Sequence, residues 1–99
     1  MNISEIVKDS LRYYFTVCKE DDLNFVITLK DKFSDLAPVM QYAVDYLNYL
    51  NQFTFTLKVV SGMRYKLSIT EGSSCYNLKN QLSDISAYLD WHNELDKRD

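Results

Sequence analysis

The fold is decided by residues 53–70, which read FTFTLKVVSGMRYKLSIT. Apolar and polar residues alternate on both sides of Ser61-Gly62, and this period of two is typical of strands with one buried face. Ser61-Gly62 supplies a two-residue turn, so the stretch predicts a β-hairpin. The side chains that it is predicted to bury are Phe53, Phe55, Leu57 and Val59 in the first strand and Met63, Tyr65, Leu67 and Ile69 in the second.

The same alternation occurs earlier in the chain, in residues 13–18 and 23–30. A polar segment, residues 19–22, separates the two runs and predicts a turn. The inward side chains of this first hairpin are predicted to be Tyr13, Phe15, Val17, Leu23, Phe25, Ile27 and Leu29. By the same alternation, Tyr14 is predicted to lie on the polar side.

Three segments show helical periodicity instead. The first covers residues 2–11, with Asn2 as its cap and Glu5 three residues later. The second ends near Asn51 and is predicted to begin after Asp35, with a short turn ahead of it. The third covers residues 75–96. The predicted apolar stripes are Leu36, Val39, Met40, Ala43, Val44, Leu47 and Leu50 on the second helix, and Leu78, Leu82, Ile85, Leu89 and Leu95 on the third.

These elements predict one α+β domain, residues 1–99, in the order α-β-β-α-β-β-α. It consists of the N-terminal helix 2–11 and two ββα units, 12–51 and 53–96. The two units form a four-stranded, mainly antiparallel sheet covered on one face by helices. They also align with each other, since Phe15-Thr16-Val17 matches Phe55-Thr56-Leu57, which suggests a duplication.

Composition narrows the function. The chain has 99 residues, a net charge of −3 and a pI near 5.0, which disfavours a dedicated nucleic-acid binder. The first residues lack the features of a signal peptide, and no apolar run approaches the length of a membrane span. Two cysteines, Cys18 and Cys75, are too few for a disulfide framework. We therefore expect a cytoplasmic protein with reduced thiols and no membrane association.

The predicted wet face of the sheet is basic. Its only charged side chains are Lys30, Lys58, Arg64 and Lys66, whereas the outer sides of the helices carry Asp45, Asp84, Asp90 and Glu94. One interpretation is a binding surface for an anion, a nucleic acid or an acidic partner. The other is a solvated strand surface whose charges keep the sheet soluble. Sheets that bind single strands normally present stacking aromatic residues, and Tyr14 is the one aromatic expected here.

A row of tyrosines marks the second helix. Tyr42, Tyr46 and Tyr49 are spaced i, i+4, i+7 along one edge of its apolar stripe. The tyrosine row and the apolar stripe together cover more of the helix circumference than the buried face of a surface helix usually does. A second element should therefore cover part of them. The alternatives are the first helix of the same chain, or a partner protein or second copy, because tyrosine is enriched at interfaces. Trp91, at the edge of the third helix's apolar stripe, could belong to the same surface.

Catalytic and metal-binding patterns are missing from the sequence. His92 is the only histidine and is expected to pack in the stripe near Leu89. With Cys18 and Cys75 it forms no recognisable zinc pattern, and Cys75 is expected to be buried and inert. There is no glycine-rich phosphate loop. We therefore predict no cofactor, no metal and no enzymatic activity.

The sequence thus favours a small cytoplasmic protein-binding module without catalysis. Its size and acidity fit an inhibitor, immunity or antitoxin-type protein of bacterial or phage origin, with a homodimer as a further possibility. The candidate partner-binding residues are Tyr42, Asp45, Tyr46, Tyr49 and Trp91. The alternative function is nucleic-acid or anion binding through Lys30, Lys58, Arg64 and Lys66.

Overall fold

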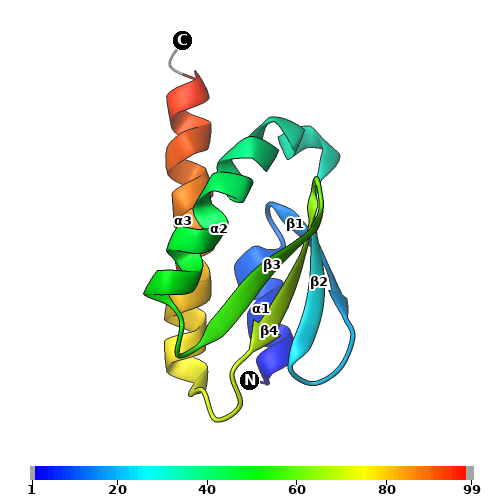
Figure 1. Ribbon diagram of the computed structural model, residues 1–99, viewed down its shortest axis with the longest axis vertical. Coiled ribbons are helices and arrows are strands. Elements are labelled where there is room, and N and C mark those ends of the chain that lie inside the picture. The colour runs from blue at the N-terminus through cyan, green and yellow to red at the C-terminus, as the bar shows by residue number, and fades with distance from the viewer. Residues whose placement is uncertain (1, 98–99) are drawn as a thin grey trace.

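The computed structural model describes the backbone of residues 2–97 and the side chains of residues 2–94. Its elements follow the predicted order α-β-β-α-β-β-α, with a short 3-10 helix, η1, ahead of the second α-helix (Figure 1). Their bounds are α1 Ile3–Leu11, β1 Phe15–Lys19, β2 Asn24–Leu29, η1 Asp31–Leu36, α2 Ala37–Leu50, β3 Phe55–Ser61, β4 Arg64–Ile69 and α3 Cys75–Lys97.

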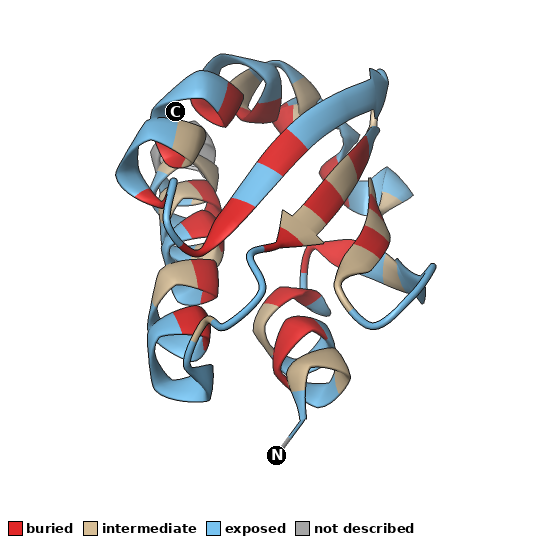
Figure 2. Cartoon of the chain, turned by 60° about the horizontal axis from the view of Figure 1, so that its bottom comes forward, coloured by how far each residue is buried: buried red, intermediate tan, exposed pale blue. Residues whose placement is uncertain are grey.

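In the described residues, four strands form one antiparallel sheet in the order β1-β2-β4-β3. The second strand of each hairpin therefore lies in the middle, where Phe25 of β2 is opposite Leu67 of β4. The three α-helices pack on one face of this sheet, as predicted (Figures 1 and 2). The strand order is symmetric about the β2–β4 junction, as a duplication would require, although the duplication itself stays a prediction.

The core lies between the sheet and the helices and confirms the predicted alternation in the two middle strands (Figure 2). The buried strand residues there are Phe25, Ile27, Leu29, Tyr65, Leu67 and Ile69. The helices contribute Met40, Ala43, Val44 and Leu47 from α2, and Leu78, Leu82, Ile85 and Leu89 from α3. Each buried leucine, isoleucine, valine, phenylalanine or methionine among them stabilises the fold by roughly 1.5–3 kcal/mol. Leu95, predicted in the same stripe, lies outside the described side chains.

Helix α1 is capped as predicted but packs elsewhere than on the tyrosines. The side-chain oxygen of Asn2 accepts a hydrogen bond from the backbone N–H of Glu5 at 2.9 Å. The helix packs on α3 and β1, where the hydroxyl of Ser86 donates to the carbonyl of Ser10 at 2.8 Å. Its apolar face is thus used inside the fold, and the first helix is not the cover for the tyrosine row of α2.

The orientation predicted for Tyr13 and Tyr14 is wrong. Strand β1 begins only at Phe15, so the alternation does not extend back to the two tyrosines. Tyr14 is buried against Phe33, with ring centroids 4.7 Å apart, while Tyr13 is exposed. Because Tyr14 is turned inward, the open face of the sheet lacks the one aromatic side chain expected there.

Phe53 was predicted to be buried and is exposed. Helix α2 ends at Leu50, and the chain turns before β3 begins at Phe55. The carbonyl of Asn51 accepts hydrogen bonds from the backbone N–H groups of Thr54 and Phe55, at 2.9 and 3.0 Å. This turn buries Thr54, which was expected on the open face, and directs Phe53 into solvent.

Helix α2 begins later than predicted. Its N-cap is Leu36 and not Asp35, because η1 occupies residues 31–36 and runs directly into the α-helix. Pro38 consequently lies at the second helical position, where no intrahelical acceptor exists for the missing N–H. The expected preliminary turn is confirmed as η1.

The turn of the second hairpin is shifted by one residue. Val59 pairs with Tyr65 and Ser61 pairs with Arg64, so the strand contains a bulge and the turn consists of Gly62 and Met63. A bulge changes the direction in which the neighbouring side chains of the strand point. Val59, predicted to be buried, is therefore exposed.

Candidate protein-binding surface

The tyrosine row of α2 points away from the sheet. Tyr42, Tyr46 and Tyr49 are 89%, 53% and 74% exposed. The helix buries Met40, Ala43, Val44 and Leu47 against the core, and this fixes its rotation. Because positions i, i+4 and i+7 lie on one helical face, the three phenol rings form a continuous strip along the outside.

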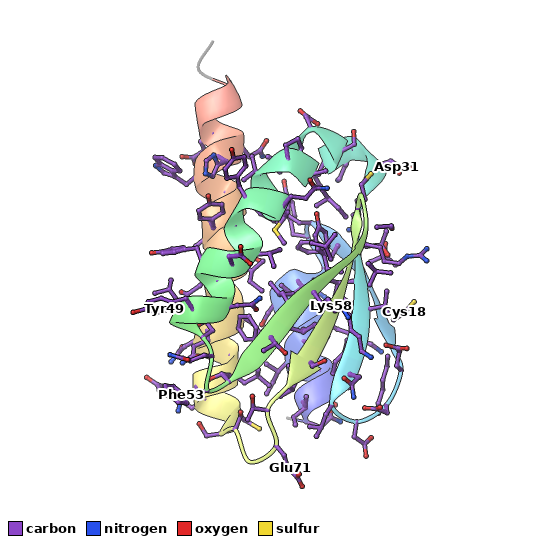
Figure 3. The ribbon with its side chains drawn as sticks, in the orientation of Figure 1. Cys18, Asp31, Tyr49, Phe53, Lys58 and Glu71 are labelled. Carbon is purple, nitrogen blue, oxygen red and sulfur yellow. The ribbon has the colours of Figure 1, made fainter. Side chains whose placement is uncertain are left out.

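Two further apolar residues extend this strip beyond the end of the helix. Leu50 is about half-exposed, although the predicted apolar stripe included it, and Phe53 is 83% exposed. Tyr49 and Phe53 project on the same side of the molecule (Figure 3). We call Tyr42, Tyr46, Tyr49, Leu50 and Phe53 the aromatic surface. Phe53 was missed as a surface residue because its place in the alternating run favoured a strand, yet it continues the tyrosine spacing at i+4 from Tyr49.

Asp45 lies beside a shallow depression at the start of the aromatic surface. The depression has a volume of about 340 Å³ and is lined by Pro38, Gln41, Tyr42 and Asp45. These residues are three or four positions apart, so they share one side of the first two turns of α2. A carboxylate, a side-chain amide and a phenol ring therefore line one opening. We call it the Asp45 depression.

Trp91 is also exposed, but it lies on α3. Helices α2 and α3 are neighbours in the fold (Figure 1). The ring of Trp91 contacts His92, with centroids 4.8 Å apart, and His92 in turn contacts Tyr88 at 4.6 Å. His92 is therefore half-buried among aromatic rings rather than packed in the apolar stripe, as was predicted. Trp91 thus contacts a separate aromatic group on α3. That it takes part in the same binding surface as the tyrosines of α2 stays a prediction.

Three of the four basic side chains predicted for the open face lie on neighbouring positions of β3 and β4. Lys58 lies directly opposite Lys66 on the neighbouring strand, and Arg64 lies two residues from Lys66 along β4 (Figure 3 labels Lys58). Lys30 follows the end of β2 and is half-buried. We call these four residues the basic patch.

An acidic turn borders the basic patch. Hydrogen bonds from the backbone N–H of Leu23 and from Asn24 lower the pKa of Asp21, and the charge of Lys66 lowers it further. Part of the positive charge of Lys66 is thus already balanced within the chain. Tyr14, the one aromatic side chain that was expected beside the basic patch, is buried in the core instead.

The cysteines lie in different environments from one another. Cys18 is exposed on the open face, as predicted (Figure 3). Cys75 was predicted to be buried and is exposed, because it opens α3 ahead of the part of the helix that packs on the sheet. A second depression of about 410 Å³ reaches Cys75, and it is lined by Asn2, Ile3, Ser4, Lys19, Asp22 and Cys75.

The described residues contain no group of three or more histidine, cysteine, aspartate or glutamate side chains placed to hold a metal ion. Within residues 2–97, every helix is too short or too polar to cross a lipid bilayer. Comparison of the chain with protein-family models, with curated proteins and with solved structures finds no match.

Proposed function

We propose that this chain is a protein-binding module without catalytic activity and that its aromatic surface is the contact region. The observation that carries the proposal is the exposure of three large rings. Tyr49 and Phe53 project on one side of the molecule, and Tyr42 shares the helical face of Tyr49 by its spacing. Isolated apolar side chains at a protein surface need no explanation, whereas a contiguous apolar patch commonly marks an interaction site.

The size of the surface supports this proposal. Its four aromatic side chains have about 200 Å² each and are on average about three-quarters exposed, which gives on the order of 600 Å². A standard interface buries about 800 Å² on each partner. The aromatic surface could thus supply most of one side of such an interface, with Asp45 at its margin and Trp91 as a proposed further contact.

The chemistry of the residues supports it as well. Tyrosine and phenylalanine lose little conformational entropy on binding, because only two side-chain torsions need to be fixed. Tyrosine is also enriched among the residues that contribute most binding energy. The three tyrosines are held on a helix whose opposite side is fixed in the core by Met40 and Leu47, so the backbone that carries them is in place before a partner arrives.

The test compares two multiple variants in affinity capture from cells of the native host. In the triple variant Tyr42→Ala, Tyr46→Ala and Tyr49→Ala, we expect the partner to be lost. The matched control, Lys58→Ala with Lys66→Ala, changes one exposed and one partly exposed residue on the open face of the sheet and should retain it. Both variants should unfold in urea close to the wild-type midpoint, since the substituted side chains are largely exposed. Retention by the triple variant would contradict the proposal.

The proposal extends to the type of binding protein and to its location. The net charge of −3 and the length of 99 residues suit an inhibitor, immunity or antitoxin-type protein of bacterial or phage origin. Exposure of both cysteines suits a reducing compartment, and we propose a cytoplasmic location. Co-expression with the captured partner, followed by an assay of that partner's activity, would show whether binding inhibits it.

A second candidate is anion or nucleic-acid binding at the basic patch. The observation in its favour is the pair Lys58 and Lys66, because like charges directly opposite each other on a sheet are destabilising unless a counter-charge is near. Charge reversal at both lysines should abolish binding to an RNA or DNA oligonucleotide, measured at low salt. No loss of binding in that variant, or no binding by the wild type, excludes this function.

A further inference from the structure

We infer that the partner of the aromatic surface presents a basic segment, and that an arginine or lysine side chain of that segment enters the Asp45 depression. The inference rests on the proposed function, since it specifies the chemistry of the partner at the same surface. It goes beyond that function because aromatic residues alone would accept partners of any charge.

The charges of the helical layer support a basic partner. Asp45 is the only charged residue in α2, and it is exposed between Tyr42 and Tyr46. On the neighbouring helix α3, residues 75–94 carry three carboxylates, Asp84, Asp90 and Glu94, and one ammonium group, Lys79. Asp90 is hydrogen-bonded to Tyr14. The two helices together therefore carry an excess of negative charge, with Asp45 as the carboxylate on the aromatic side of α2, and this excess attracts basic segments.

The lining of the Asp45 depression matches a cationic side chain. The carboxylate of Asp45 can form an ion pair, and the amide oxygen of Gln41 can accept a hydrogen bond. The phenol ring of Tyr42 lines the same opening, so it lies beside a side chain that enters the depression. Arginine fits this lining best, because its planar group has several N–H donors that can reach a carboxylate and an amide oxygen together.

The same charge disfavours two other occupants. A second copy that bound through a two-fold axis across α2 would bring its own Asp45 toward this one, and like charges at an interface cost affinity. A wholly apolar partner would desolvate the Asp45 carboxylate without pairing it. A second copy that offered its basic patch instead would make a head-to-tail contact, which does not close and would link copies into chains.

The experiment is selection of short random peptides displayed on phage against the immobilised full-length chain. Selections run in parallel on the wild type, on Asp45→Asn, on the triple tyrosine variant, and on Glu71→Gln. Glu71 provides the matched control, because it is an exposed carboxylate in the loop before α3, well apart from Tyr49 (Figure 3). The peptides are then synthesised, and their affinities are measured at low and high salt.

We expect the wild-type peptides to be enriched in arginine and lysine next to apolar residues, and depleted in aspartate and glutamate. Their affinity should fall at least about tenfold in Asp45→Asn, a change of about 1.4 kcal/mol, and should be unchanged in Glu71→Gln. It should also fall with rising salt, as an interaction between exposed charges does.

The outcomes separate this inference from the proposed function. Peptides that need the tyrosines but show no basic enrichment would overturn the inference and leave the proposed function standing. Peptides that bind the triple tyrosine variant as well as the wild type, or a selection that enriches none, would overturn both. Sedimentation of the wild type as a dimer that the tyrosine substitutions dissociate would assign the surface to a second copy and overturn the basic partner.

Discussion

The hydroxyl of Tyr14 donates a hydrogen bond to the carboxylate of Asp90, 76 residues later in the chain. The bond joins the segment before β1 to the outer part of α3, near the end of the described side chains. It gives α3 an attachment outside the apolar stripe, since Asp90 follows Leu89, the last buried leucine of that stripe.

Removal of this hydroxyl should destabilise the protein. We expect Tyr14→Phe to lower the free energy of unfolding by about 1 kcal/mol, because the ring stays packed and only the bond to a solvent-accessible carboxylate is lost. Tyr13→Phe is the matched control and should have no measurable effect, since that side chain is exposed. Urea unfolding of both variants measures the difference. An equal effect in both would mean that the bond to Asp90 contributes nothing.

The same residue should make stability depend on alkaline pH. Burial, and then the hydrogen bond and charge of Asp90, raise the pKa of Tyr14, and burial raises the pKa of Tyr65. In the unfolded chain both phenols have a pKa of about 10. Their stabilising contribution is therefore fully present below about pH 10 and is lost as the pH rises through the raised values of the folded protein.

Urea midpoints measured between about pH 8 and pH 11 test this dependence. The wild type should lose stability over the upper part of that range, and Tyr14→Phe should lose less. Lysines titrate in the same range and act as a common background in both proteins. Parallel curves for wild type and variant would be inconsistent with a raised pKa at Tyr14.

Asn48 should stabilise the edge of the sheet. Its side chain donates to the carbonyl of Leu57 at 2.8 Å and accepts from the N–H of the same residue at 2.6 Å, so it pairs with β3 as a neighbouring strand would. Asn48→Ala should lower the free energy of unfolding by about 1–3 kcal/mol, because two half-buried backbone groups lose their partner.

Asn80→Ala offers the matched control for Asn48, because Asn80 is exposed on α3. It should leave the urea midpoint nearly unchanged. Hydrogen exchange supplies a local measurement, since the amide of Leu57 should exchange faster in Asn48→Ala than in either the control or the wild type. Unchanged exchange at Leu57 would show that other groups protect it.

Substitution by alanine should have a large effect on stability at Phe55 and almost none at Phe53. Phe55 is fully buried, and Phe55→Ala should lower the free energy of unfolding by about 3–5 kcal/mol. Phe53→Ala should change it by less than about 0.5 kcal/mol, because the ring is already in solvent. The partner captured by the wild type should nevertheless bind Phe53→Ala more weakly. A large loss of stability in Phe53→Ala would place that ring in the core.

The fold could be predicted from the sequence wherever short-range periodicity decides it. The alternation in β2 and β4 predicted their buried side chains, and Asn2 with Glu5 predicted the start of α1. The errors lie at the boundaries of the elements, above all where a strand begins. Tyr14 and Phe53 each belong to an alternating run that starts before its strand, and nothing local marks the residue at which pairing begins.

The candidate surface could be predicted only in part. The spacing of Tyr42, Tyr46 and Tyr49 indicated a common face, but whether that face is covered depends on where α1 packs, and that is a long-range choice. The Asp45 depression was missed because its shape depends on where α2 begins, and the sequence favoured Asp35 over Leu36 as the cap. Cys75 was misjudged for a similar reason, since its exposure depends on how far α3 projects beyond the sheet.

The hydrogen bonds between Asn48 and Leu57 also bear on how this sheet could grow. An incoming strand would have to displace the asparagine before it could pair with the middle of β3. The asparagine thus occupies the two backbone groups of Leu57 that a neighbouring molecule would otherwise use, which protects this part of the outer strand against association between sheets.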